Sequence, residues 1–196
     1  MLKPQQITTP IGTSSWININ DGMPDRGKDG SYTPKFKVDL IVPKANMSDF
    51  MNQANQFHKA VADDLGTTIR PLPIKNELDE EGNPTGNVII KATLNYFPER
   101  DGKKETKVTM FSADNEPFTP DGLVGKGTKM QVSINMSPYN TGGNKGVTFR
   151  IKAVRIIDVV YYGGNDTNDF GDAVEGNTSA PSEKNTLEPA TDFADF

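Results

Sequence analysis

Cysteine is absent from this 196-residue chain, and histidine occurs only once, as His58. Without cysteine the chain can form no disulfide, no thiolate metal site and no thiol nucleophile. A single histidine also gives a histidine zinc site or a Ser-His-Asp triad almost nothing to build from. We therefore expect His58 to be a surface or boundary residue, and we expect the protein to bind no metal and no other cofactor.

Long apolar runs are also missing. No stretch approaches the ~18 apolar residues that a membrane-spanning helix needs, and residues 1–6 lack the apolar segment of a signal peptide. The expectation is a soluble, cytoplasmic protein with no membrane association. The lack of cysteine fits the reducing compartment that this location implies.

Charge is divided unevenly along the chain. From residue 163 to the end there are eight acidic residues and one base, so this segment carries a net charge of −7. The remaining 20 basic and 18 acidic residues leave residues 1–162 at +2. Gly, Asn, Asp, Thr, Ser and Pro dominate after Gly163, which predicts a disordered tail at 163–196. A basic body with an acidic tail is typical of a nucleic-acid binder carrying its own electrostatic competitor; the alternative is a solvated terminus with no role.

Apolar and polar residues mostly alternate before residue 163, which predicts strands with one buried and one wet face. The predicted strands are 13–20, 36–42, 87–97, 106–111, 130–136 and 147–162. In 36–42 the shared apolar face consists of Phe36, Val38, Leu40 and Val42. In 147–162 the expected buried side consists of Val147, Phe149, Ile151, Ala153, Ile157 and Val159.

One segment has the period of a helix instead. Ser48 is its predicted N-cap, Gly66 its predicted C-terminal stop, and between them runs one apolar stripe formed by Phe50, Ala54, Phe57, Val61 and Leu65. A single helix over about 48–65 beside six strands favours a mainly β fold. The predicted fold class is an OB-fold-type Greek-key β-barrel with one docked helix, formed by residues 1–162.

Motifs for other chemistry fail on their spacing. Lys126 in the Gly122–Thr128 segment is followed by glycine and then by a strand, so the segment does not fit a phosphate-binding P-loop. Asp21, Asp25 and Asp29 lack the ligand order of a calcium loop. No pair of carboxylates is singled out for catalysis, so we expect no enzyme; a hydrolase using carboxylates is an alternative without a visible constellation.

Basic and aromatic side chains combine on the predicted wet faces and in the adjoining loops. Cations that neutralise phosphates and flat rings that stack on bases, at ~1–3 kcal/mol per base, allow a protein to bind single strands without reading sequence. Each ring can instead belong to the core. The predicted DNA-binding residues are Trp16, Lys35, Lys37, Lys91, Phe97, Arg100, Lys103, Lys104, Lys107, Phe111, Tyr139, Lys145, Arg150 and Lys152.

Several short segments form an ordered series: Val108–Ala113, Gly125–Lys129, Ser137–Asn140, Asn144–Val147 and Ala153–Ile157. Together with the tail, this series resembles the bacteriophage-encoded single-stranded-DNA-binding proteins, which have an OB-fold and an acidic tail ending in phenylalanine. The resemblance covers about 33–162 and the final residues, and the order of the segments carries it.

The resemblance implies a protein that coats single-stranded DNA during replication and recombination, in the host cytoplasm if it is phage-encoded. It also implies that the tail competes with DNA and contacts replication or recombination proteins through Asp192, Phe193, Asp195 and Phe196. Two other interpretations stay open, namely an RNA-binding or cold-shock-like OB module and a structural β protein of a virion. The sequence leaves a homodimer open beside a monomer.

Overall fold

A computed structural model gives the structure of residues 1–20, 24 and 33–162. The predicted tail, with Asp192, Phe193, Asp195 and Phe196, lies outside the described residues, so its disorder and its contacts stay predictions. The elements of the described residues are β1 (Gln5–Thr8), β2 (Gly12–Asn18), β3 (Lys35–Pro43), η1 (Lys44–Asn46), α1 (Ser48–Leu65), β4 (Ile74–Leu78), β5 (Pro84–Asn95), β6 (Thr109–Phe111), β7 (Lys129–Thr141) and β8 (Asn144–Asp158).

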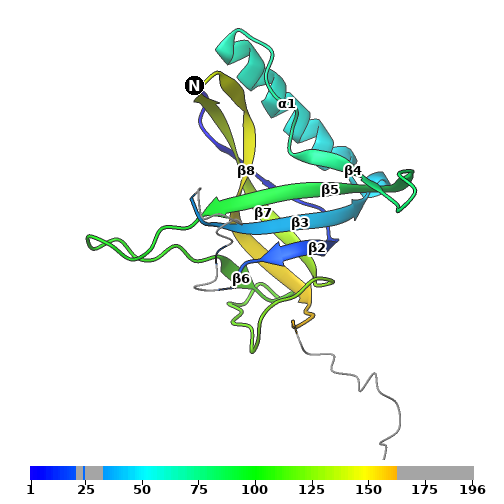
Figure 1. The fold of residues 1–196 in the computed structure, drawn as a ribbon, viewed down its shortest axis with the longest axis vertical. Helices are drawn as coiled ribbons and strands as arrows, with labels where there is room; N and C mark the ends of the chain where they lie inside the picture. Colours follow the sequence, from blue (N-terminus) through cyan, green and yellow to red (C-terminus); the bar gives the residue numbers. More distant parts are fainter. Residues whose placement is uncertain (21–23, 25–32, 163–196) are drawn as a thin grey trace, which may run out of the picture. The chain divides into compact units, whose positions relative to one another are not determined.

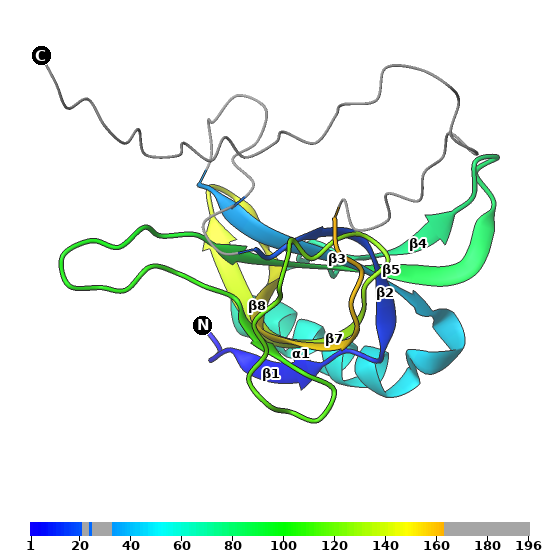
Figure 2. The same ribbon diagram turned by 90° about the horizontal axis from the view of Figure 1, so that it is seen from below.

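Five of the strands close into a barrel (Figure 1). β2 pairs with β3, β3 with β5, β5 with β8, β8 with β7, and β7 again with β2. Counted along the chain, the barrel strands are joined in the order 1-2-3-5-4-1, which confirms the predicted OB-type barrel. β1 is added to β7, β4 to β5 and β6 to β8. Figure 2 shows β1 and β7 on the opposite side of the barrel from β3 and β5.

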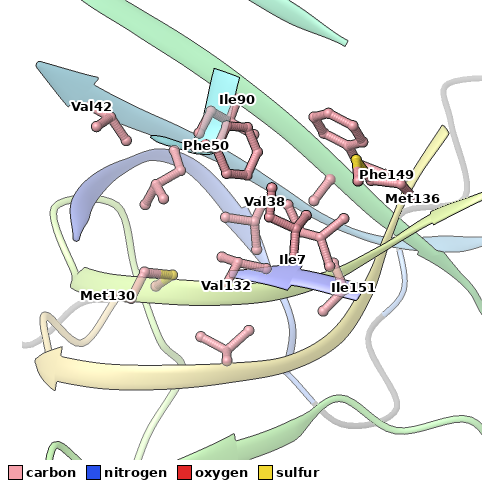
Figure 3. Packing of buried hydrophobic residues seen from close by; sticks show 14 of the residues in the cluster. Ile7, Val38, Val42, Phe50, Ile90, Met130, Val132, Met136, Phe149 and Ile151 are labelled. Atoms are coloured by element: carbon pink, nitrogen blue, oxygen red, sulfur yellow. The ribbon is translucent and has the colours of Figure 1, made fainter. Parts of the chain in front are cut away.

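The barrel interior is filled by the alternating apolar residues. All four predicted core residues of 36–42 are at most 1 % exposed, and the same holds for Met130, Val132, Ile134 and Met136 of β7. Figure 3 shows Val38 of β3 and Val132 of β7 extending toward the same interior. Fully burying a side chain of this kind stabilises the fold by ~1.5–3 kcal/mol, so this alternation decides which residues remain outside for binding.

α1 spans the predicted range and packs its apolar stripe against the barrel. Phe50, Ala54, Phe57 and Val61 are buried, whereas Leu65 is half-buried. The ring of Phe50 meets that of Phe149 in β8 edge-on, with centroids 5.9 Å apart. No helix in the described part of the chain is long and apolar enough to cross a membrane.

β8 departs from the predicted alternation. Val154 and Ile156 are buried, in place of the predicted Ala153, Ile157 and Val159. The pairing with β7 shows the reason, because Ile134 lies opposite Ile151 while the preceding residue, Ser133, lies opposite Ala153. Lys152 is therefore an extra residue on β8, and a second register shift makes Ile157 another. Each β-bulge reverses which way the following residues face.

Three other expectations were wrong in detail. The N-cap of α1 is Met47 rather than Ser48, and no side chain caps the helix, although Gly66 ends it in the left-handed conformation as predicted. Gly142 and Gly143 have φ of 56° and 83°, so they form a two-residue hairpin turn, and β8 begins at Asn144 rather than at the predicted residue 147. β6 covers only Thr109–Phe111 of the predicted 106–111, and it pairs in parallel with β8. The short strands β1 and β4 were not predicted.

Candidate nucleic-acid interface

The outward residues of β3 and β5 form one polar surface, which we name the β3–β5 face. Its members alternate with core residues and are Lys35, Lys37, Asp39, Lys91, Thr93 and Asn95. The register places Lys37 between Asn18 of β2 and Thr93 of β5, and Thr93 lies opposite Arg150 of β8. Neighbouring strands are roughly 4.8 Å apart. Lys37 and Arg150 therefore flank Thr93 in one row across the barrel.

A second row on the same face contains Trp16, Asp39 and Lys91, each opposite the next. Lys91 Nζ lies 3.1 Å from Asp39 Oδ2, with the two side chains 45 % and 24 % exposed. The Asp39 carboxylate offsets part of the positive charge of Lys91, which was predicted to bind DNA. Asp39 was missing from the predicted site, because the alternation places it on this face but only the register shows which cation it meets.

Trp16 is exposed and borders a cleft beside β2. The indole is 59 % exposed, and it lines a cleft of about 400 Å³ together with Leu123, Lys126 and Tyr162. The ring of Tyr162 is 80 % exposed. An indole, a phenol and an ammonium group thus surround one cleft. Lys126 and Tyr162 were not predicted, because only the folded chain brings their segments next to β2.

Phe97 stands just beyond β5 and is 59 % exposed, as a stacking ring must be. Residues 98–107 then leave the barrel as an arm, at the opposite end of β5 from the β4–β5 hairpin (Figure 1). The backbones of Arg100 and Lys103 bond to each other at 3.2 and 2.9 Å, and the guanidinium of Arg100 pairs with Asp101 at 3.4 Å. The predicted basic cluster is therefore exposed on this arm: Arg100, Lys103, Lys104 and Lys107.

Tyr139 and Lys145 are half-buried near the tip of the β7–β8 hairpin. A Cβ on Gly146 would lie 2.7 Å from Tyr139 Oη and 2.9 Å from Cζ, so the ring packs directly against the glycine backbone. Arg70 adds a cation that was not predicted. Its backbone N–H donates to the Lys145 carbonyl at 2.8 Å, and its guanidinium donates to Asn144 Oδ1 at 2.5 Å.

Phe111 and Lys152 lie on a different surface from the β3–β5 face. They line a groove of about 420 Å³ over β1, β6, β7 and β8, which we name the β7–β8 groove. Arg155 lines it as well and donates to Gln131 Oε1 at 2.9 Å. The alternation did not predict Arg155 as an outward residue, because the bulge at Lys152 reverses the facing of the residues after it. The predicted residues are thus divided between the β3–β5 face, the arm, the hairpin tip and this groove.

The fold is similar to those of solved phage proteins. It matches gp2.5, a single-stranded DNA binding protein encoded by bacteriophage T7, over 92 % of this chain and 100 % of that chain, with a TM-score of 0.61 and 20 % identity. It also matches the single-stranded DNA-binding protein from bacteriophage Enc34 in complex with ssDNA, over 78 % of this chain and 86 % of that chain, with a TM-score of 0.58 and 17 % identity. A C-terminal truncation of the Enc34 protein matches over 78 % and 85 %, with a TM-score of 0.59 and 15 % identity. No protein-family pattern and no curated protein sequence matches the chain.

Proposed function

We propose that this protein binds single-stranded DNA without sequence preference and serves phage DNA replication or recombination in the host cytoplasm, without catalysis. The β3–β5 face carries the proposal, since it sets Lys37 and Arg150 in one row and the exposed ring of Trp16 in the next. OB barrels bind oligonucleotides on the face of their second and third strands, which here are β3 and β5. The similarity to a phage protein solved with ssDNA supports the proposal.

Two physical terms make up the binding. Lysine and arginine side chains neutralise phosphates and release counterions, and exposed rings stack on bases at ~1–3 kcal/mol each. Residues 1–162 have a net charge of only +2, so the affinity depends on where the cations gather rather than on their number.

Titration of labelled oligo-dT at two salt concentrations tests the proposal. If about four phosphates are neutralised, with a slope of ~−0.7 for each, a fourfold rise in salt weakens binding roughly 50-fold. An affinity independent of salt would contradict it. A gel shift that compares single- with double-stranded DNA, and poly-U with poly-dT, separates the alternatives, because a preference for poly-U indicates a module that reads the 2′-hydroxyl.

The tail at 163–196 is proposed to compete with DNA for the β3–β5 face and to bind replication or recombination proteins through Asp192, Phe193, Asp195 and Phe196. Its net charge of −7 against a basic body supports this role. If it is disordered as predicted, this segment of 34 residues (163–196) has a root-mean-square reach of about 30 Å. Removing 163–196 should tighten DNA binding and abolish partner binding, whereas an unchanged DNA affinity would count against competition.

A further inference from the structure

Among the residues that the structure describes, the lining of the β7–β8 groove includes two cations and no acidic side chain. Its lining residues are Gln6, Thr8, Phe111, Asn115, Gln131, Ser133, Lys152, Ala153, Val154 and Arg155. The Lys152 ammonium donates to Gln6 and the Arg155 guanidinium donates to Gln131, and both partners are neutral amides. Within residues 1–20, 24 and 33–162, neither cation forms an ion pair with a carboxylate. Both cations are therefore held by neutral partners, which orient them without cancelling their charge.

The groove also offers an apolar wall and an unused hydroxyl. Phe111 is half-buried at the end of β6 and lies opposite Arg155 of β8, and Ala153 lines the same groove. The hydroxyl of Ser133 is buried, and no hydrogen-bond partner for it exists among the described residues. A buried hydroxyl without a partner costs free energy, so a ligand that accepts or donates a bond there would remove that cost.

The bulge in β8 creates this arrangement and connects it to the β3–β5 face. Because Lys152 is the extra residue, Val154 turns into the core and Arg155 turns toward the groove. Arg150 lies before the bulge, opposite Thr93 of the β3–β5 face. At about 3.3 Å per residue, the stretch from Arg150 through Lys152 to Arg155 covers roughly 17 Å. Cations therefore follow β8 from the face into the groove.

We propose that the β7–β8 groove is a second nucleotide subsite, into which the single strand passes from the β3–β5 face by way of Arg150. Lys152 and Arg155 bind a phosphate of that nucleotide, and its base packs against Phe111. The hydroxyl of Ser133 bonds to the sugar or to the base edge. A nucleotide fits better than an acidic peptide because the cations continue the row of the candidate DNA face. This inference rests on the proposed function.

A length series of oligo-dT tests the subsite with the full chain. An oligonucleotide of about 6 nucleotides is short enough to occupy the β3–β5 face alone, and one of about 16 can reach the groove as well. The double variant Lys152→Gln, Arg155→Gln should bind the longer oligonucleotide at least about tenfold more weakly, with a salt slope smaller by about 1.4 for two lost phosphates. Its affinity for the shorter one should change less than about twofold.

Two further variants keep the result interpretable. Lys59→Gln removes one positive charge, half of what the double variant removes, from an exposed position of α1 that belongs to neither surface, and it should leave both affinities unchanged. Trp16→Ala should weaken binding of both lengths. If circular dichroism shows that the double variant is unfolded, Lys152→Gln alone replaces it, since this side chain is exposed.

The outcomes separate the subsite from the function. Two results would overturn the subsite and leave the proposed function standing. In the first, the double variant binds the longer oligonucleotide with the affinity and salt slope of the wild type. In the second, it loses equal affinity for both lengths. A wild-type protein that binds neither oligonucleotide would overturn the function itself. If the double variant keeps its DNA affinity but loses binding of a synthetic peptide with the sequence of residues 191–196, the groove is a peptide site and the proposal is wrong.

Discussion

The β3–β5 face and the β7–β8 groove belong to one barrel and carry the same kinds of side chain, yet their cations are held differently. On the face, Lys91 pairs with the carboxylate of Asp39 at 3.1 Å. In the groove, Lys152 and Arg155 are held by glutamine amides. An amide orients a cation without cancelling its charge, whereas a carboxylate does both. Asp39 should therefore weaken the contribution of Lys91 to DNA binding, so that Trp16 is the largest single contribution of the face, whereas both cations of the groove contribute their full charge.

Replacing the ring of the face should have the largest effect. Trp16→Ala removes an indole that is 59 % exposed, and a lost stacking interaction of ~1–3 kcal/mol weakens oligo-dT binding by about 5- to 150-fold. Because the ring is largely outside the core, the free energy of unfolding should change by less than about 0.5 kcal/mol. Fluorescence anisotropy and chemical denaturation measure the two quantities. Leu78→Ala, at an exposed position of β4, is the control, and equal affinities of the two variants would contradict a stacking role.

Near the tip of the β7–β8 hairpin, the ring of Tyr139 differs from that of Trp16 because it is already packed against Gly146. Gly146→Ala would place a Cβ 2.7 Å from Tyr139 Oη, and such overpacking typically costs ~1–3 kcal/mol of stability. Denaturant unfolding should show this loss. Adding Tyr139→Phe removes the closest atom and should restore part of it. A Gly146→Ala variant as stable as the wild type would mean that the Tyr139 ring can move away and serve as a stacking platform.

The same two surfaces show how far the sequence could predict the site. Regular alternation identified Lys37 and Lys91 as outward residues and their neighbours as core. The alternating strands, together with the single helix, also predicted the barrel class. It could not place Arg155, because one extra residue in β8 reverses the facing of everything after it. It also could not pair Asp39 with Lys91, since cross-strand register depends on long-range contacts that a local pattern does not contain.

Removing the Asp39 carboxylate should make DNA binding by the β3–β5 face depend more on charge, as is expected of the β7–β8 groove. Asp39→Asn leaves Lys91 without its ionic partner and should tighten oligo-dT binding by up to about fivefold, the size expected of an exposed ion pair worth ~0.2–1 kcal/mol. The salt slope should steepen by about 0.7, for one added phosphate contact. Asp63→Asn removes the same charge from an exposed position of α1 and is the control. If both variants change the affinity equally, only net charge matters and the Asp39–Lys91 pair has no local role.

The smallest effect is expected from the buried hydroxyl of the groove, and it separates binding from stability. Ser133 Oγ has no hydrogen-bond partner among the described residues, so Ser133→Ala should leave the free energy of unfolding unchanged or raise it by up to about 1 kcal/mol. Ser14 is the matched control, since its hydroxyl donates to the Gly125 carbonyl at 3.3 Å and Ser14→Ala should lower stability by about 1 kcal/mol. On a long oligonucleotide Ser133→Ala should weaken binding about two- to fivefold, the loss of one neutral hydrogen bond. A stability loss like that of Ser14→Ala, together with unchanged DNA affinity, would show that the Ser133 hydroxyl serves the barrel rather than a ligand.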